Sequence, residues 1–133
     1  MKNVLIVCTG NSCRSQMAEA LVNERLHGEW TAFSAGTAPE GYVHPLAIAA
    51  LHEIGIEHSG RSKHIEVYDG IRFDLVVTVC DNANAACPAW VGGGGERLHM
   101  PFRDPFSSRD LEVYKQVRDA IDAKLIPALR ERN

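Results

Sequence analysis

The residues best suited to chemistry lie near the start of the chain, in the sequence CTGNSCRS at positions 8–15. Cys8 carries a thiol that becomes a strong nucleophile when it is deprotonated, and Arg14 carries a planar guanidinium that can bind two oxygens of a tetrahedral anion. Gly10 and Asn11, between them, tolerate the left-handed backbone angles of a tight loop. The pattern therefore predicts a loop that binds an oxyanion beside a nucleophilic thiol.

The flanking segments predict how this loop is held. Residues 3–7 (NVLIV) are apolar, as in a buried strand, and residues from 15 to about 27 carry apolar side chains at helical spacing, with Gly28 as the stop. A loop between them presents backbone N–H groups at a helix N-terminus, which favours anions. We expect this field to lower the pKa of the Cys8 thiol, and the Ser15 hydroxyl to donate a hydrogen bond to it. The residues expected around the anion are Thr9, Gly10, Asn11, Ser12, Cys13, Arg14 and Ser15.

Two other interpretations of these cysteines remain open. A free cysteine at the end of a strand is ordinarily a small buried apolar residue, and Cys8 taken alone fits that description. The C-x5-R spacing, with a strand before it and a helix after it, favours the nucleophile. The four cysteines could also bind zinc, but their C-x4-C and C-x6-C spacings are looser than the usual C-x2-C pair. We expect no metal or other cofactor, and for Cys13 only a backbone N–H turned to the anion.

The rest of the chain alternates between predicted strands and helices. Further strands are predicted at residues 30–36, 73–79 and 96–102, and further helices at 44–55 and from about 108. Pro127 is expected to kink or end the last helix, residues 56–72 have no clear pattern, and the glycines at 92–95 read as a flexible surface connection. The alternation predicts one α/β domain over residues 1–133: a three-layer sandwich with a central four-stranded parallel sheet and helices on both faces.

Composition excludes several function classes. The chain has 133 residues and a formal charge of −3, with no basic block that would bind nucleic acid and no apolar run of membrane-spanning length. The apolar start is too short for a signal peptide, so we expect a cytoplasmic protein. We also expect it to be a monomer. In a reducing compartment four cysteines are more often metal-binding or reactive than disulfide-bonded. The six histidines show no metal-binding spacing, and we expect most of them at the surface.

The motif CTGNSCRS resembles the phosphate loop of the low-molecular-weight tyrosine phosphatases. The segments RFDLVVTVCDNANAACP and FRDP resemble the thioredoxin-coupled arsenate reductases that are built on the same fold. This resemblance implies that Cys8 attacks arsenate and that Cys80 and Cys87 carry oxidising equivalents outward to thioredoxin. It implies that Asp104 is the general acid, and that phosphate or sulfate binds as an analogue of arsenate.

The resemblance also bears on a possible cation. Some members of the family bind potassium beside the loop, and Asn11, Glu19 and Ser34 match the residues of that site. His64 stands where an aspartate is expected. We therefore expect no resident potassium ion.

Three functions remain open at this stage. A phosphatase needs only Cys8, Arg14 and Asp104, since water completes its second step. A two-electron reduction of arsenate also needs a second thiol, Cys80, to attack the sulfur of the Cys8 adduct, and Cys87 to pass the disulfide outward. A module that binds oxyanions or senses redox state without turnover is the third. An aspartate before a proline is also common in turns, and two buried cysteines can be inert.

A helix over residues 81–86 would have a mechanical consequence. It would hold the Cα atoms of Cys80 and Cys87 about 10 Å apart along its axis. A disulfide needs about 4.4 to 6.8 Å, so forming this bond would require the segment to unwind.

Overall fold

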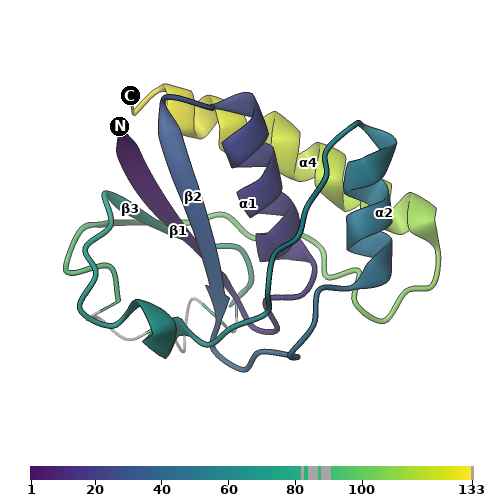
Figure 1. Cartoon of the computed structure of the whole chain (residues 1–133), viewed down its shortest axis with the longest axis horizontal. Helices are drawn as coiled ribbons and strands as arrows, with labels where there is room; N and C mark the ends of the chain where they lie inside the picture. The colour runs from purple at the N-terminus through teal and green to yellow at the C-terminus, as the bar shows by residue number, and fades with distance from the viewer. Residues whose placement is uncertain (82, 84–86, 88–90, 133) are drawn as a thin grey trace.

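The computed structural model describes residues 1–81, 83, 87 and 91–132. Its centre is a parallel sheet whose spatial order is β2-β1-β3-β4 (Figure 1). The strands are β1 (Lys2–Cys8), β2 (Trp30–Gly36), β3 (Leu75–Thr78) and β4 (Glu96–His99). The predicted four-stranded parallel sheet is confirmed.

Three α-helices and one 3-10 helix accompany the sheet. They are α1 (Arg14–Arg25), α2 (Pro45–Glu53), η1 (Ile65–Tyr68) and α4 (Leu111–Arg130). In Figure 1, α1, α2 and α4 lie together on one side of the sheet, and η1 lies on the other. Because all strands are parallel, the loops that follow them meet at one edge of the sheet, which is where ligands bind in such folds.

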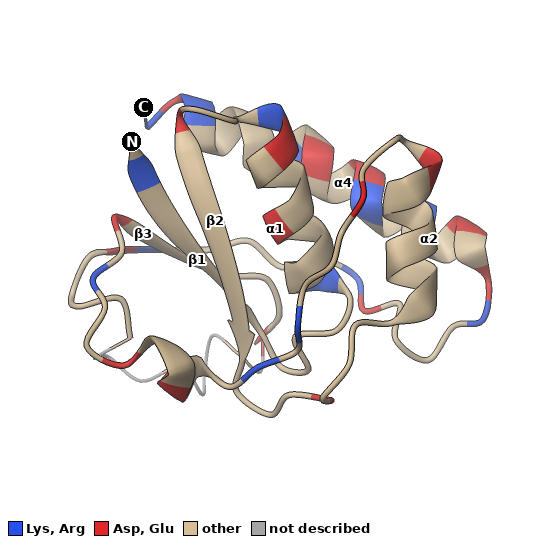
Figure 2. Ribbon diagram, viewed as in Figure 1, with Lys and Arg blue, Asp and Glu red and all other residues tan. Residues whose placement is uncertain are grey.

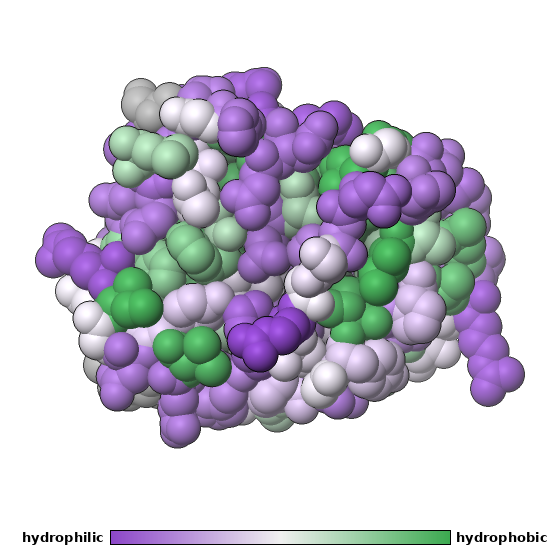
Figure 3. Space-filling view, in the orientation of Figure 1, coloured by the Kyte–Doolittle hydropathy of each residue, from purple (hydrophilic) through white to green (hydrophobic). Residues whose placement is uncertain are grey.

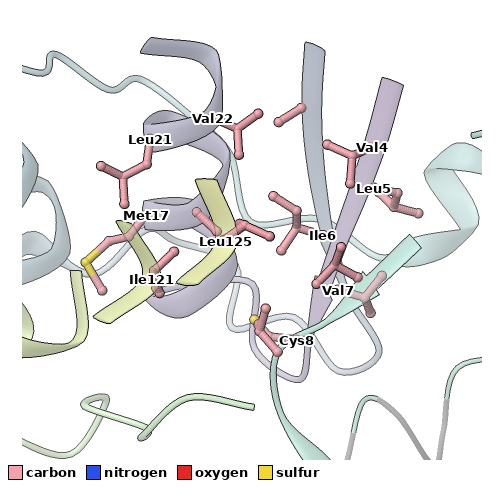
Figure 4. Packing of buried hydrophobic residues seen from close by; sticks show 14 of the residues in the cluster. Val4, Leu5, Ile6, Val7, Cys8, Met17, Leu21, Val22, Ile121 and Leu125 are labelled. Carbon is pink, nitrogen blue, oxygen red and sulfur yellow. The ribbon is translucent and has the colours of Figure 1, made fainter. Parts of the chain in front are cut away.

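Alternation of side chains along β1 explains how both faces are covered. Figure 4 shows Val4 and Ile6 pointing toward apolar side chains of α1 and α4, with Leu5 pointing away from them. Leu5 is in register with Phe33 of β2, whose ring contacts Tyr68 of η1 edge to face at 5.9 Å. Successive residues of a strand face opposite sides, so a continuous apolar run is what a strand buried on both faces requires.

The last helix differs from its prediction at both ends. It begins at Leu111, where the Asp110 side chain caps its first turn, and not at about residue 108. It also continues past Pro127 to Arg130, so the proline does not end the helix early. A proline removes one N–H donor, here the one that would pair with the carbonyl four residues back, and the helix continues without that bond. The carbonyl of Pro127 still accepts a hydrogen bond from the N–H of Glu131, at 3.1 Å.

The strand predicted through residue 102 ends early, as β4, at His99. Beyond it the chain keeps two hydrogen bonds to the end of β3: the N–H of Met100 donates to the carbonyl of Thr78 at 2.8 Å, and that of Phe102 to the carbonyl of Val79 at 3.0 Å. These bonds carry the chain along the carboxyl edge of the sheet. The segment that follows, with the FRDP sequence, is thereby brought beside the loop after β1.

The glycine run is more tightly packed than predicted. Gly92 is buried with a φ of 83°, and its carbonyl accepts a hydrogen bond from the N–H of Phe73 at 3.0 Å. A Cβ at this position would collide with the side chain of Val76. The start of this run is therefore a close approach of two backbones and not a loose surface connection.

The surface carries charges of both signs without a large block of either. Figure 2 shows lysines and arginines interspersed with aspartates and glutamates. On the face in Figure 3, apolar patches are small and separated by hydrophilic side chains. Among the described residues, no helix is long and apolar enough to cross a membrane.

Candidate active site

The loop after β1 holds the Cys8 sulfur by two hydrogen bonds. The N–H of Asn11 donates to it at 3.1 Å, and the Ser15 hydroxyl lies 2.8 Å away. The side-chain amide of Asn11 donates to the Ser15 oxygen at 2.8 Å, which leaves the serine hydrogen for the sulfur. Asn11 has a φ of 48°, the left-handed geometry expected of the loop. Cys8 itself is only 2% exposed, and Figure 4 shows it at the end of β1.

The predicted lowering of the Cys8 pKa is wrong in direction. Burial raises the pKa of this thiol, because a thiolate there loses its water. The hydrogen bonds of Ser15 and Asn11 and the charge of Arg14 act in the opposite direction and are outweighed. Burial, with a smaller contribution from the Asp104 charge, also raises the pKa of the Cys13 thiol, to about 12.

A second segment, which showed no pattern in the sequence, supports the loop from behind. The backbone N–H of Lys63 donates to the side-chain carbonyl of Asn11 at 2.9 Å, and the Ser62 hydroxyl donates to the carbonyl of Gly10, also at 2.9 Å. Gln16, fully buried on α1, donates to the backbone carbonyl of Asn11 at 3.1 Å. No short motif marks these residues, because they meet the loop only in the folded chain.

Arg14 and Asp104 meet at the mouth of the loop. Their nearest side-chain atoms, Nη2 and Oδ2, are 3.5 Å apart, and the arginine side chain is 11% exposed against 55% for the aspartate. Arg14 also donates to the carbonyl of Phe102 at 3.1 Å, and Asp104 accepts the N–H of Phe106 at 3.0 Å. The guanidinium is therefore held from one side and keeps donors for a ligand.

A cavity of about 360 Å³ opens over the loop. It is lined by Cys8, Thr9, Gly10, Ser12, Cys13, Arg14, Glu40, Cys80, Asp81, Asp104 and Phe106. Four of the five predicted catalytic residues, Cys8, Arg14, Cys80 and Asp104, thus come together from three separate segments. Glu40, Asp81 and Phe106 also line the cavity, and no motif in the sequence marks them.

The other two predicted reactive thiols are also buried. The sulfur of Cys80 lies 3.2 Å from the Thr9 hydroxyl and accepts the N–H of Ala83 at 3.4 Å. Cys87 is 8% exposed and does not line the cavity. Burial raises the pKa of the Cys87 thiol, and Arg97, which donates to its carbonyl at 3.3 Å, acts in the opposite direction. All four cysteines are free thiols.

The helix expected between these two cysteines falls largely outside the described residues. Asp81 and Ala83 are helical, and the N–H of Cys87 donates to the carbonyl of Ala83 at 2.9 Å, four residues back. Residues 82 and 84–86 are not described.

The residues that match a potassium site are engaged with other partners. The Ser34 hydroxyl donates to Glu19 at 3.0 Å, and the other Glu19 oxygen lies 3.8 Å from the His58 ring. The Asn11 amide nitrogen bonds Ser15, and its oxygen bonds the backbone N–H of Lys63. Burial raises the pKa of Glu19, and the positive charge of Lys63 acts in the opposite direction. In this arrangement the residues of the set bond to one another and to their protein neighbours. Among the described residues, no three His, Cys, Asp or Glu side chains converge as a metal-binding group.

Comparisons with known proteins agree with this geometry. The family model for the low molecular weight phosphotyrosine protein phosphatases matches residues 3–131. The chain belongs to this family. Within it, the chain is 40% identical to "Arsenate reductase 1" of Bacillus cereus over 125 residues, which cover 93% of this chain and 91% of that protein.

Solved structures extend the likeness to three dimensions. An arsenate reductase in a phosphate-binding state matches with a TM-score of 0.86 and 32% identity over 98% of both chains. An arsenate reductase in an oxidized state matches with a TM-score of 0.86 and 30% identity over the full length of both. The resemblance predicted from the sequence is confirmed.

Proposed function

We propose that this member of the phosphatase family reduces arsenate to arsenite through a relay of the Cys8, Cys80 and Cys87 thiols. The observation that carries the proposal is the second thiol in the cavity: the Cys80 sulfur hydrogen-bonds Thr9, the residue next to Cys8. Hydrolysis of a phosphoester needs no second thiol. The similarity to proteins named arsenate reductase supports the same conclusion.

The first step joins Cys8 to arsenic. The loop N–H groups and Arg14 bind the oxyanion, and the sulfur attacks arsenic as one As–O bond breaks. The bound arsenate keeps the thiol proton, and the departing hydroxyl leaves as water after Asp104, as the acid, delivers one proton to it. Because burial raises the pKa of Cys8, the sulfur is best activated when the bound arsenate dianion itself accepts the thiol proton.

The second step transfers the electrons. The Cys80 sulfur attacks the Cys8 sulfur, and the S–As bond breaks with its electron pair going to arsenic. Arsenic passes from the +5 to the +3 state and leaves as arsenite, while the two thiols become a Cys8–Cys80 disulfide.

The third step clears the active site. Cys87 attacks Cys80, which frees Cys8 and moves the disulfide to Cys80–Cys87, where a thioredoxin dithiol reduces it. Cys87 is buried, so its segment must open for a partner to reach it. Amide hydrogen exchange tests this motion: oxidation is expected to lower protection over residues 81–95 and to leave β3 unchanged. Equal protection in both states would contradict it.

Aryl phosphate hydrolysis is the second candidate activity. It requires Cys8, Arg14 and Asp104, and all three line the cavity. The solved relative in a phosphate-binding state supports binding of the analogous anion. We propose this as a side activity, and we keep a cytoplasmic monomer as the expected form.

A coupled assay decides between the candidates. The whole chain is mixed with thioredoxin, thioredoxin reductase, NADPH and arsenate, and we expect one arsenite formed per NADPH oxidised. Replacing arsenate by phosphate is the control and should consume no NADPH, because phosphorus is not reduced. Hydrolysis of an aryl phosphate without arsenite formation would select the phosphatase, and anion binding without either turnover would select the sensor.

A further inference from the structure

A cluster of aromatic side chains lies behind the segment that carries Asp104. Tyr114 of α4 is fully buried, and its ring stacks on that of His44, the residue that caps α2, at a centroid distance of 4.9 Å. Phe106, two residues beyond Asp104, packs edge to face on His44 at 5.6 Å. The cluster therefore joins two helices to the acid-bearing loop.

The Tyr114 hydroxyl sits at the centre of this cluster, with His44, two backbone carbonyls and the Cys13 thiol as its polar neighbours. The His44 Nε2 atom lies 3.1 Å away, the carbonyl of Ser108 3.2 Å, and the carbonyl of Phe106 3.3 Å. A tyrosine hydroxyl has one hydrogen to donate and lone pairs to accept. Each bond must therefore have a direction.

Those directions follow from the other nitrogen of His44. Its Nδ1 accepts the N–H of Leu46 at 3.1 Å, so the neutral ring carries its hydrogen on Nε2. Burial lowers the pKa of His44, which keeps the ring neutral. His44 therefore donates to the Tyr114 oxygen. The Cys13 thiol, kept protonated by its raised pKa, can donate to the same oxygen, so the Tyr114 hydrogen is left for the carbonyls of Phe106 and Ser108. Burial raises the pKa of Tyr114, so it stays a phenol able to donate.

These carbonyls belong to the turn that presents Asp104. The N–H of Phe106 donates to the Asp104 carboxylate at 3.0 Å, and the N–H of Ser108 donates to the carbonyl of Pro105 at 2.8 Å. Hydrogen bonds that hold the backbone at Phe106 and Ser108 therefore also hold the Phe106 N–H, which orients the Asp104 carboxylate.

We propose that Tyr114, oriented by His44, is a positioning residue for Asp104, acting through its hydrogen bonds to the loop carbonyls. The inference rests on the proposed role of Asp104 as the acid. It goes beyond that role, because it assigns a function to two residues that do not line the cavity, one on α4 and one that caps α2.

Tyr114→Phe tests this with the ring retained. We expect kcat/KM for arsenate to fall roughly fivefold, the loss typical of one net hydrogen bond, with KM little changed. His44→Asn keeps a side chain that can cap α2 but is too short to reach Tyr114, so a smaller loss in the same direction is expected. Tyr68→Phe is the matched control: it removes a hydroxyl on the opposite face of the sheet and should change neither constant. Thermal unfolding verifies that each variant is folded.

A double-mutant cycle separates positioning from general structural damage. If Tyr114 acts through Asp104, adding Tyr114→Phe to Asp104→Asn produces no further loss of kcat/KM. Losses that multiply would overturn the inference and leave the acid role intact, as would an unchanged Tyr114→Phe beside an impaired Asp104→Asn. An unimpaired Asp104→Asn would overturn the acid role itself, and the positioning role with it.

Discussion

The loop that holds Cys8 and the segment that begins at Cys80 treat their sulfurs differently. The Cys8 sulfur has hydrogen bonds with a backbone N–H and with the Ser15 hydroxyl. The Asn11 side chain fixes that hydroxyl, and the backbone N–H of Lys63 in turn fixes the Asn11 side chain. The Cys80 sulfur has contacts to the Thr9 hydroxyl and to a backbone N–H at 3.4 Å. In the proposed mechanism, the sulfur that meets the substrate is held by a layered network, and the sulfur that attacks another sulfur has longer contacts that are easier to break.

This difference has a physical reason. A nucleophile gains from a fixed geometry, because its partner atom arrives in one orientation. A relay thiol must approach one sulfur and then be approached by another, so a rigid setting would block one of the two exchanges. Substitutions in the two regions should therefore affect the two activities differently, with effects that range from complete loss to a small change in rate.

Cys8→Ser is expected to abolish both activities. A serine hydroxyl does not ionise near neutral pH, so arsenate reduction and aryl phosphate hydrolysis should each fall by more than about a thousandfold. The fold should be unchanged, since serine is close to cysteine in size. Turnover within tenfold of the parent protein would exclude Cys8 as the nucleophile.

Cys80→Ser and Cys87→Ser are expected to affect only reduction. Either change should stop repeated arsenite production, because no disulfide can be passed to thioredoxin, while aryl phosphate hydrolysis stays within about twofold. Arsenite counted per enzyme, beside hydrolysis of para-nitrophenyl phosphate, measures the split. Loss of hydrolysis in either variant would make the residue structural and remove the distinction between the two regions.

Asn11 tests how far the layered network stabilises the first region. Asn11→Gly keeps the left-handed backbone but removes the amide bonds to Ser15 and Lys63, and we expect it to cost about 1–2 kcal/mol of unfolding free energy. Asn11→Ala removes the same bonds and adds left-handed strain, which costs about 1 kcal/mol more. Urea unfolding of the three proteins measures both. Equal stability of the glycine and alanine variants would mean that the loop relaxes to another backbone geometry.

Much of this architecture could be predicted from local sequence. The run NVLIV and the apolar spacing on α1 predict a strand and a helix because each is decided by near neighbours, and the loop between them is recognisable for the same reason. Pro127 shows the limit of a local rule. Its effect depends on where it falls in the helix, and in a last turn the helix continues to Arg130.

What the sequence could not predict depends on residues that are far apart. His44 and Tyr114 are separated by 70 positions, and neither stands in a motif. His58, predicted with the surface histidines, has a side chain that is 8% exposed and reaches Gln16 at 2.7 Å. The pKa of Cys8 was predicted in the wrong direction because hydrogen bonds can be guessed from a loop, whereas burial comes from the whole fold.

Thr9→Val probes the contact that joins the two regions, and its expected effect is the smallest. Valine has nearly the shape of threonine and keeps the loop N–H, but it removes the hydroxyl 3.2 Å from the Cys80 sulfur. Formation of the Cys8–Cys80 disulfide after one arsenate turnover should slow by roughly threefold to tenfold, since one side-chain hydrogen bond to the attacking sulfur is lost. Aryl phosphate hydrolysis should not change. Rapid quenching with a thiol-alkylating reagent measures the rate of disulfide formation. The control is Thr31→Val, near the start of β2 and so at the opposite edge of the sheet from Thr9. A slower hydrolysis in Thr9→Val would show that the hydroxyl assists Cys8. The contact would then contribute to the nucleophile's loop and not to the thiol relay.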